Sequence, residues 1–270
     1  MPIVVEVNEA RKNRRSVEVE GYTNTAREED KFFATLYIGA APSTAAADLA
    51  DLGSDKSLPQ AYLVEQPAAA TVPPHFHDSD QFQVFVAGNV VFGKKPVQSL
   101  SLHYAGCHTP YGPIVTKGQG AHYFTLRAQW DAGGKPMPES GHLLKPVPRC
   151  HRLVEDIGSA AASGGRADVL PCESDGLGAA LFNLAPSKSE ILDMPFVGAG
   201  QYALVVSGSV SNGDANLSKN SCVYRYADDE PLNVVAGIDG ARVLLMQDLP
   251  CTVMLDRLML ACGSFSNSSN

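Results

Sequence analysis

The chain has 270 residues, with 21 lysines and arginines against 29 aspartates and glutamates, which gives a net charge of −8. This acidic balance disfavours nucleic acid and anionic membranes as partners, because both attract basic protein surfaces. Hydrophobic residues make up 44% of the chain and charged residues 19%, alongside 24 glycines and 18 prolines. Such a composition is typical of a turn-rich globular β protein and disfavours a helical bundle or a disordered chain.

The N-terminal segment predicts a cytoplasmic protein. Its basic cluster follows the short apolar stretch, which is the reverse of a secretory signal. No apolar run approaches the roughly 18 residues that a membrane span needs. Together with the acidic net charge, this disfavours a membrane and a nucleic acid as partners. The expected partner is a small-molecule substrate.

Short runs of β-branched and aromatic residues alternate along the chain with glycine, proline, asparagine and aspartate, which predicts many short strands. The predicted strands, in chain order, are 32–38, 61–64, 81–87, 100–104, 122–128, 180–184, 202–207, 221–226 and 242–247. This spacing indicates an all-β sandwich or barrel with few short helices.

A constant offset of 120 residues aligns the two halves of the chain over a long stretch without a gap. The run QFQVFVAG at 81–88 lies over QYALVVSG at 201–208, and Gly120 lies over Gly240. Glycines at turns and apolar residues on strands are what a shared turn and pleat geometry requires. The sequence therefore predicts two copies of one β domain.

The offset and the composition divide the chain into five predicted parts. They are an N-terminal arm with extra strands at 1–55, a first barrel at 56–132, a linker with a short helix at 133–165, a second barrel at 166–262 and a flexible tail at 263–270. Because such barrels commonly cover their strand edges by pairing, a homodimer is expected.

The segment PPHFHDSDQ at 73–81 places two histidines and a glutamine close together ahead of a predicted strand. Residues two apart on a strand share a face, so His75 and His77 are expected to point into one cavity, where two imidazoles can bind one metal ion. The Asp-Ser-Asp turn then lets Gln81 offer its side-chain oxygen to the same point. These residues predict a divalent metal site.

The same residues resemble the first motif of the cupin superfamily, Gly-x5-His-x-His-x3-4-Glu-x6-Gly. His75, His77 and Gly88 stand at the spacing of this motif. Gln81 takes the acidic position, and Ala69 stands where the leading glycine is expected. Because the chain repeats, the resemblance implies a bicupin, in which two tandem jelly-roll barrels follow each other and the first carries the metal motif.

The second cupin motif is poorly kept, so the third metal donor stays open. Tyr111 lies within its Pro-x-Gly element, but Val115 then stands at the position of the ligand histidine. The candidates for the missing donor, or for proton transfer, are His108, Tyr111 and His103. Arg127, in the run FTLRAQW, is expected to pair with a cross-strand carboxylate or to bind an anionic substrate.

The second copy serves as an internal control for these candidates. Each candidate is compared with the residue 120 positions later in the second copy. Every candidate donor except Gln81 is replaced there by another residue type, and Gln81 aligns with Gln201. His75, for example, aligns with Pro195. If the histidines were needed only for folding, the second barrel would need them too, so their confinement to the first copy favours a functional site there.

The sequence thus predicts a metal-dependent bicupin enzyme that acts on a small oxygen-rich organic substrate. His75, His77 and Gln81 would hold iron, manganese, nickel or zinc, whose open positions would stabilise an enolate or activate dioxygen. His108 or Tyr111 would transfer protons. The fold is compatible with dioxygenase and with isomerase or lyase chemistry. The alternative is a non-catalytic bicupin that binds or senses a small molecule.

Overall fold

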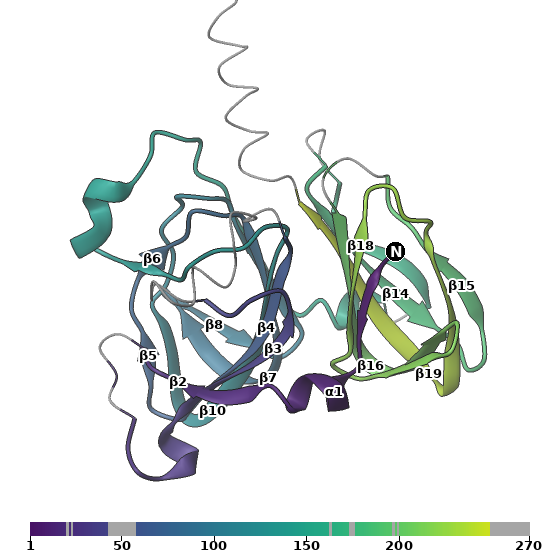
Figure 1. The fold of residues 1–270 in the computed structure, drawn as a ribbon, viewed down its shortest axis with the longest axis horizontal. Helices are drawn as coiled ribbons and strands as arrows, with labels where there is room; N and C mark the ends of the chain where they lie inside the picture. Colours follow the sequence, from purple (N-terminus) through teal and green to yellow (C-terminus); the bar gives the residue numbers. More distant parts are fainter. Residues whose placement is uncertain are drawn as a thin grey trace, which may run out of the picture.

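The structure is a computed structural model, and it describes residues 1–19, 22, 24–42, 58–161, 164–172, 176–195, 198 and 200–248. Two antiparallel β-barrels lie side by side (Figure 1). Within the described residues, the helical segments are the α-helix α1 (Val7–Arg11) and the 3-10 helices η1 (Glu28–Asp30), η2 (Glu139–Leu143) and η3 (Ser159–Ala161). The predicted all-β class with two jelly-roll barrels is confirmed. None of the described helices is long and apolar enough to cross a membrane.

The first barrel is built on a sheet in the order β12-β9-β7-β10-β4-β3-β2, with β5 paired to β10 and β8 to β7. A separate two-stranded sheet joins β6 and β11. These strands are β2 (Arg14–Val17), β3 (Phe32–Ile38), β4 (Gln60–Gln66), β5 (Thr71–Val72), β6 (His75–Phe76), β7 (Gln81–Phe92), β8 (Lys95–Gln98), β9 (Ser101–Ala105), β10 (Ile114–Arg127), β11 (Lys135–Pro136) and β12 (His151–Val154).

The second barrel is built on a sheet in the order β1-β18-β16-β19-β14-β13, with β15 paired to β19 and β17 to β16. Its strands are β1 (Ile3–Val5), β13 (Gly165–Leu170), β14 (Gly178–Leu184), β15 (Ser189–Leu192), β16 (Gly200–Asn212), β17 (Ala215–Ser218), β18 (Cys222–Tyr226) and β19 (Leu232–Asp248).

The N-terminal arm connects the two barrels. Its first strand, β1, pairs with β18 of the second barrel, and its second strand, β2, pairs with β3 of the first. Between them lies α1, where the backbone N–H of Val7 donates to the hydroxyl of Ser221 at 3.1 Å. One short segment therefore extends both sheets and fixes one barrel against the other (Figure 1).

The segment 133–165, predicted as a linker, also supplies strands to the first barrel. β11 pairs with β6, and β12 pairs with β9. Pro136 is tolerated in β11 because this short strand pairs on one side only, where a missing N–H is least costly. The stretches 43–57 and 249–270 lie outside the described residues, and with them lies the predicted tail 263–270.

β7 is buried on both of its faces because the two barrels pack against each other. Phe82 and Val84 belong to an apolar core that they share with Tyr202 of the second barrel. Gln81 and Gln83, which alternate with them along the strand, point into the first barrel. Burial on both faces explains why the alternation of polar and apolar residues at 81–84 gives way to the apolar residues at 85–87.

The offset of 120 residues relates equivalent backbone positions. Gly88 and Gly208 both have a positive φ, of +75° and +69°. A Cβ at either residue would lie 2.0 or 2.1 Å from a carbonyl oxygen, that of Gly120 or of Gly240. Only glycine fits such a position, which is why the turn glycines carry the repeat in the sequence.

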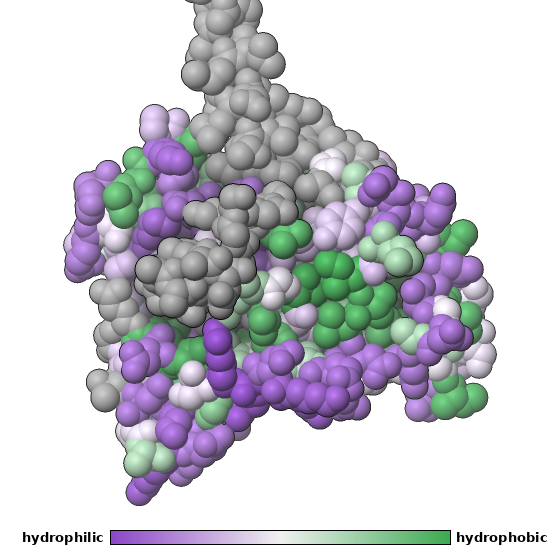
Figure 2. Space-filling view, in the orientation of Figure 1, coloured by the Kyte–Doolittle hydropathy of each residue, from purple (hydrophilic) through white to green (hydrophobic). Residues whose placement is uncertain are grey.

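Apolar surface gathers over the second barrel, around the place where β14 and β18 are labelled in Figure 1, whereas the surface directly below this patch in the view is mostly hydrophilic (Figure 2). Three large apolar side chains of this barrel are exposed: Ile191, Val235 and Ile238. The homodimer expected from the sequence stays a prediction.

Candidate functional site

A cavity of about 400 Å³ lies inside the first barrel. Much of its wall is apolar and includes Phe32, Leu36, Val64 and Ile114. Polar side chains from β4, β6, β7 and β10, and from the segments that follow β6 and β9, also line it. They form one hydrogen-bonded cluster: Tyr62, His75, His77, Gln81, Tyr111 and Arg127. The cavity found in the described part of the second barrel measures only about 10 Å³ and has an almost entirely apolar lining.

His75 and Tyr111 form a neutral pair at the cavity wall. The imidazole of His75 donates from Nδ1 to the carbonyl oxygen of Pro73 at 2.7 Å, which leaves the lone pair on Nε2. That lone pair accepts a hydrogen bond from the Tyr111 hydroxyl at 2.8 Å. The side-chain amide of Gln81 donates to the same hydroxyl oxygen. Burial and the neighbouring His77 lower the pKa of His75 to about 3, and burial raises the pKa of Tyr111.

His77 is held by the buried carboxylate of Asp131. Nδ1 of His77 donates to Oδ1 of Asp131 at 2.7 Å, and the backbone N–H groups of Asp78 and Gly133 donate to the same carboxylate at 2.9 and 2.8 Å. Burial alone would raise the pKa of Asp131, but His77 and Arg127 hold it well below its usual range. Burial and the Arg127 guanidinium lower the pKa of His77. At neutral pH the pair is therefore a carboxylate and a neutral imidazole with its lone pair on Nε2.

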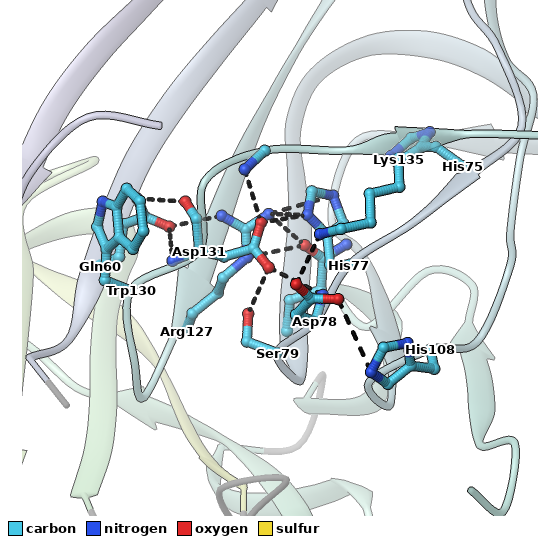
Figure 3. A network of polar contacts seen from close by, with 12 residues as sticks. Gln60, His75, His77, Asp78, Ser79, His108, Arg127, Trp130, Asp131 and Lys135 are labelled. Carbon is cyan, nitrogen blue, oxygen red and sulfur yellow. Dashed lines mark hydrogen bonds and ion pairs between the residues drawn. The ribbon is translucent and has the colours of Figure 1, made fainter. Parts of the chain in front are cut away.

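Arg127 is fully buried at the centre of the cluster (Figure 3). Its Nη1 donates to the side-chain oxygen of Gln60 at 2.6 Å and to the hydroxyl of Tyr62 at 3.1 Å. Its Nη2 and Nε donate to the side-chain oxygen of Gln81 at 2.8 and 3.2 Å. Nη2 also lies 3.1 and 3.2 Å from the two ring nitrogens of His77, so the guanidinium lies against this imidazole. All three guanidinium nitrogens therefore have protein partners.

The second barrel fixes the backbone at this point. The hydroxyl of Tyr202 lies 2.8 Å from the carbonyl oxygen of Arg127 and 3.1 Å from that of Gln60. A buried tyrosine hydroxyl needs such a polar partner. Because Tyr202 comes from β16, the position of the Arg127 backbone depends on contact between the two barrels.

This cluster does not fit a divalent metal ion. The lone pair of His75 accepts the Tyr111 hydroxyl, and the Gln81 oxygen accepts the Arg127 guanidinium. Two unit charges 4 Å apart repel by about 4 kcal/mol at an effective dielectric constant of 20, and a divalent ion beside a guanidinium doubles this. No group of three or more His, Cys, Asp or Glu side chains able to hold a metal occurs in the described residues.

Two of the six predicted site residues lie outside the lining of the cavity. His103 is fully buried behind Tyr111, with ring centroids 4.8 Å apart. His108 lies on the far side of Asp78, with its Nε2 3.7 Å from the carboxylate (Figure 3), while its backbone N–H donates to the carbonyl oxygen of His77. The structure brings together the other four residues, which are His75, His77, Gln81 and Tyr111.

The sequence-based reasoning missed one member of the cluster, Tyr62, and two residues that hydrogen-bond to the cluster, Gln60 and Asp131. It also gave Arg127 different partners. Arg127 contacts a histidine and a glutamine directly and reaches the carboxylate of Asp131 only through His77. The repeat could have identified Arg127 as a site residue, because Gln81 is kept in the second copy whereas Arg127 is replaced there by Gln247. A cation confined to one copy, beside candidate donors confined to the same copy, points to one shared site.

Several solved structures share this fold along most of the chain. A candidate dioxygenase from Nostoc punctiforme aligns with a TM-score of 0.61 at 12% identity, over 92% of this chain and 83% of its own. Pirin YhhW from Escherichia coli, in complex with nickel(II), aligns at 0.56 and 13% identity, over 92% of this chain and 100% of its own. A variant of salicylate 1,2-dioxygenase from Pseudoaminobacter salicylatoxidans, in complex with gentisate, aligns at 0.53 and 14% identity, over 96% of this chain and 84% of its own. No family model and no curated protein matches the sequence.

Proposed function

We propose that this protein, which has the cupin fold, binds a small cyclic organic molecule with hydroxyl or carbonyl oxygens in its first barrel. The resemblance to the cupin superfamily is confirmed at the level of the fold. The observation that carries the proposal is the cavity of about 400 Å³, in which apolar walls surround one polar cluster. Cavities of roughly 300–1,000 Å³ with this division of polar and apolar groups are typical of small-molecule sites. Because the cluster does not fit a metal ion, the proposed binding is metal-independent.

The charges around the cavity favour a neutral ligand. The Arg127 guanidinium is balanced by the Asp131 carboxylate, with His77 between them. At the wall formed by the N-terminal arm, one basic residue, Arg15, and one acidic residue, Glu18, line the cavity. The aromatic and apolar walls suit a ring, while the tyrosine hydroxyls suit its oxygen substituents.

The two imidazoles favour a second candidate function, which is proton transfer of the isomerase or lyase type. Asp131 fixes the tautomer of His77, and the Pro73 carbonyl fixes that of His75. His77 is the candidate base of the two, because the lone pair of His75 accepts the Tyr111 hydroxyl. A neutral imidazole held in a defined orientation can take a proton from a carbon next to a carbonyl group and return it elsewhere. The sequence predicted metal-dependent chemistry of this type, whereas the route proposed here would need no metal.

The two probes that test the proposal are hydroquinone and gentisate, which differ by one carboxylate. Isothermal titration should show that hydroquinone binds the wild-type protein and that gentisate binds more weakly, because the cavity has no unbalanced positive charge. Ala34→Phe fills the cavity from β3 and should abolish binding. Ala87→Phe, on the partly buried outer side of β7, is the matched control and should retain it. Equal binding in both variants would contradict the proposal.

The second candidate function has its own measurement. In deuterated water, the wild-type protein should speed deuterium exchange next to the carbonyl of cyclohexane-1,2-dione, followed by proton NMR. His77→Gln should lose this acceleration, while hydroquinone binding persists. If the wild-type protein does not accelerate the exchange, the proton-transfer function is contradicted and only the binding function is kept.

A further inference from the structure

We propose that the guanidinium of Arg127 takes the place of a divalent metal ion in the first barrel, and that removing its charge opens a metal site formed by His75, His77 and Gln81. The inference concerns the polar cluster alone and does not depend on which molecule the cavity binds. The proposed metal site is latent, because in the natural chain the Arg127 guanidinium prevents a metal ion from binding there.

Arg127 contacts side chains that could otherwise bind a metal ion. This residue touches two of the three donors that the sequence assigns to a metal, since Nη2 contacts the ring of His77 and the side-chain oxygen of Gln81. An amide oxygen that accepts two guanidinium N–H groups is turned toward a positive charge, as it would be toward a metal ion. The guanidinium therefore contacts two of the three donors that would otherwise face a metal, whereas the third, His75, accepts the Tyr111 hydroxyl.

The charges of the polar cluster and Asp131 are balanced when Arg127 is present and no metal ion is bound. Arg127 is fully buried and Asp131 is 3% exposed, so each charge needs the other. Within the polar cluster and Asp131, one carboxylate balances one guanidinium. A divalent ion among the same donors would add two positive charges with no further carboxylate to balance them, so the guanidinium and the metal exclude each other.

The second barrel supplies an internal comparison. Gln201 and Gln247 stand 120 residues after Gln81 and Arg127. The side-chain amide of Gln201 donates to the side-chain oxygen of Gln247 at 2.7 Å, and that of Gln247 donates to the carbonyl oxygen of Pro195 at 3.0 Å. The side-chain oxygen of Gln201 is buried and accepts no hydrogen bond from the part of the chain that the structure describes. When glutamine replaces arginine at this position, no described residue thus occupies the oxygen of the facing glutamine.

This comparison selects the substitution that tests the inference. Arg127→Gln copies a pair of residues with which this chain already forms a barrel, so the variant is expected to fold. It frees the oxygen of Gln81 and removes the charge next to His77. Two imidazoles and one amide oxygen, completed by water, suit nickel(II), cobalt(II) or zinc(II) better than calcium or magnesium.

The experiment uses the full chain without a histidine tag and cobalt(II) as the probe. Metal is measured by elemental analysis after dialysis against cobalt(II) and by visible absorption of the bound ion. The wild-type protein and Arg127→Lys, which keeps the charge, should hold no cobalt above the dialysis buffer. Arg127→Gln should hold about one equivalent, and adding His75→Ala and His77→Ala should remove it.

Two results would overturn the inference. In the first, the wild-type protein holds one equivalent of cobalt that is lost on His75→Ala and His77→Ala, so the guanidinium does not exclude a metal. In the second, Arg127→Gln shows a wild-type circular dichroism spectrum and a cooperative melt but holds no cobalt. If Arg127→Gln does not fold, Arg127→Met makes the same test with a side chain of similar length. The binding of hydroquinone to the wild-type protein is measured separately. Failure of the proposed small-molecule binding is therefore distinguished from failure of the latent metal site.

Discussion

The carboxylate of Asp131 accepts a hydrogen bond of 2.7 Å from Nδ1 of His77. The other contacts of this imidazole include the guanidinium of Arg127, so a carboxylate, a neutral ring and a cation form one buried unit. Such a unit is most stable when complete, because each buried charge compensates the other.

Removing the carboxylate should therefore destabilise the fold. Asp131→Asn leaves the Arg127 guanidinium buried without a counter-charge and should lower the free energy of unfolding by about 3–5 kcal/mol. Asp168→Asn, which breaks the exposed ion pair with Arg166, is the control and should cost about 0–1 kcal/mol. Urea denaturation followed by circular dichroism measures both. In an Arg127→Gln background the cost of Asp131→Asn should shrink, and strict additivity of the two changes would contradict the coupling.

Acidification should weaken the fold through its buried histidines. The pKa of His75 is lowered by burial, and further by His77, from 6.5 to about 3. Between these values the unfolded chain binds a proton at His75 that the folded chain does not, so the free energy of unfolding falls by about 1.4 kcal/mol for each pH unit of acidification. This contribution is fully present above about pH 6.5 and is lost as the pH falls toward 3. His77, whose pKa is also lowered, acts in the same direction.

Urea titrations between about pH 5 and pH 6 measure this slope. His75→Gln should reduce it by about one proton relative to the wild-type protein, because the variant has no imidazole to protonate at this position. An unchanged slope in His75→Gln would show that this imidazole titrates alike in the folded and unfolded chains.

The hydroxyl of Tyr111 is expected to matter more than that of Tyr123, although both side chains line the cavity. Tyr111→Phe leaves Nε2 of His75 and the amide of Gln81 without their buried partner and should cost about 1–3 kcal/mol. Tyr123→Phe removes only a hydroxyl that lies 3.4 Å from Gln66 and should cost less than about 1 kcal/mol. Thermal unfolding compares the two variants, and equal losses would be inconsistent with a tightly bonded Tyr111.

Alanine substitutions at the repeated glycines should destabilise both barrels. Gly88→Ala and Gly208→Ala each place a Cβ within about 2 Å of a carbonyl oxygen at a positive φ, and each should cost at least about 1–2 kcal/mol. Gly118→Ala is the control on the same sheet, because its Cβ would meet no atom within 4 Å, and it should stay within about 0.5 kcal/mol of the wild-type protein. A tolerated Gly88→Ala would contradict the role of glycine in the repeat.

Much of the fold could be predicted because its signals are local. Turn glycines, β-branched runs and the offset of 120 residues follow from turn geometry and the strand pleat, which each repeat must satisfy on its own. The pairing of β1 with the second barrel and of β12 with the first could not be predicted in this way. Strand pairing between distant segments depends on which edges are free once both barrels have formed, and no local pattern encodes that.

For the candidate site, the sequence by itself determined that His75 and His77 share one face of the first copy and that Gln81 returns toward them, because a two-residue spacing and a tight turn are local properties. Only the tertiary structure decided what these side chains face. Arg127 lies 46 residues after Gln81 in the sequence, yet its guanidinium contacts that side chain, because β7 and β10 are neighbours in the sheet. Whether a buried donor meets a metal ion or a guanidinium depends on charge compensation by groups such as Asp131, and that balance is set only when the barrel closes around them.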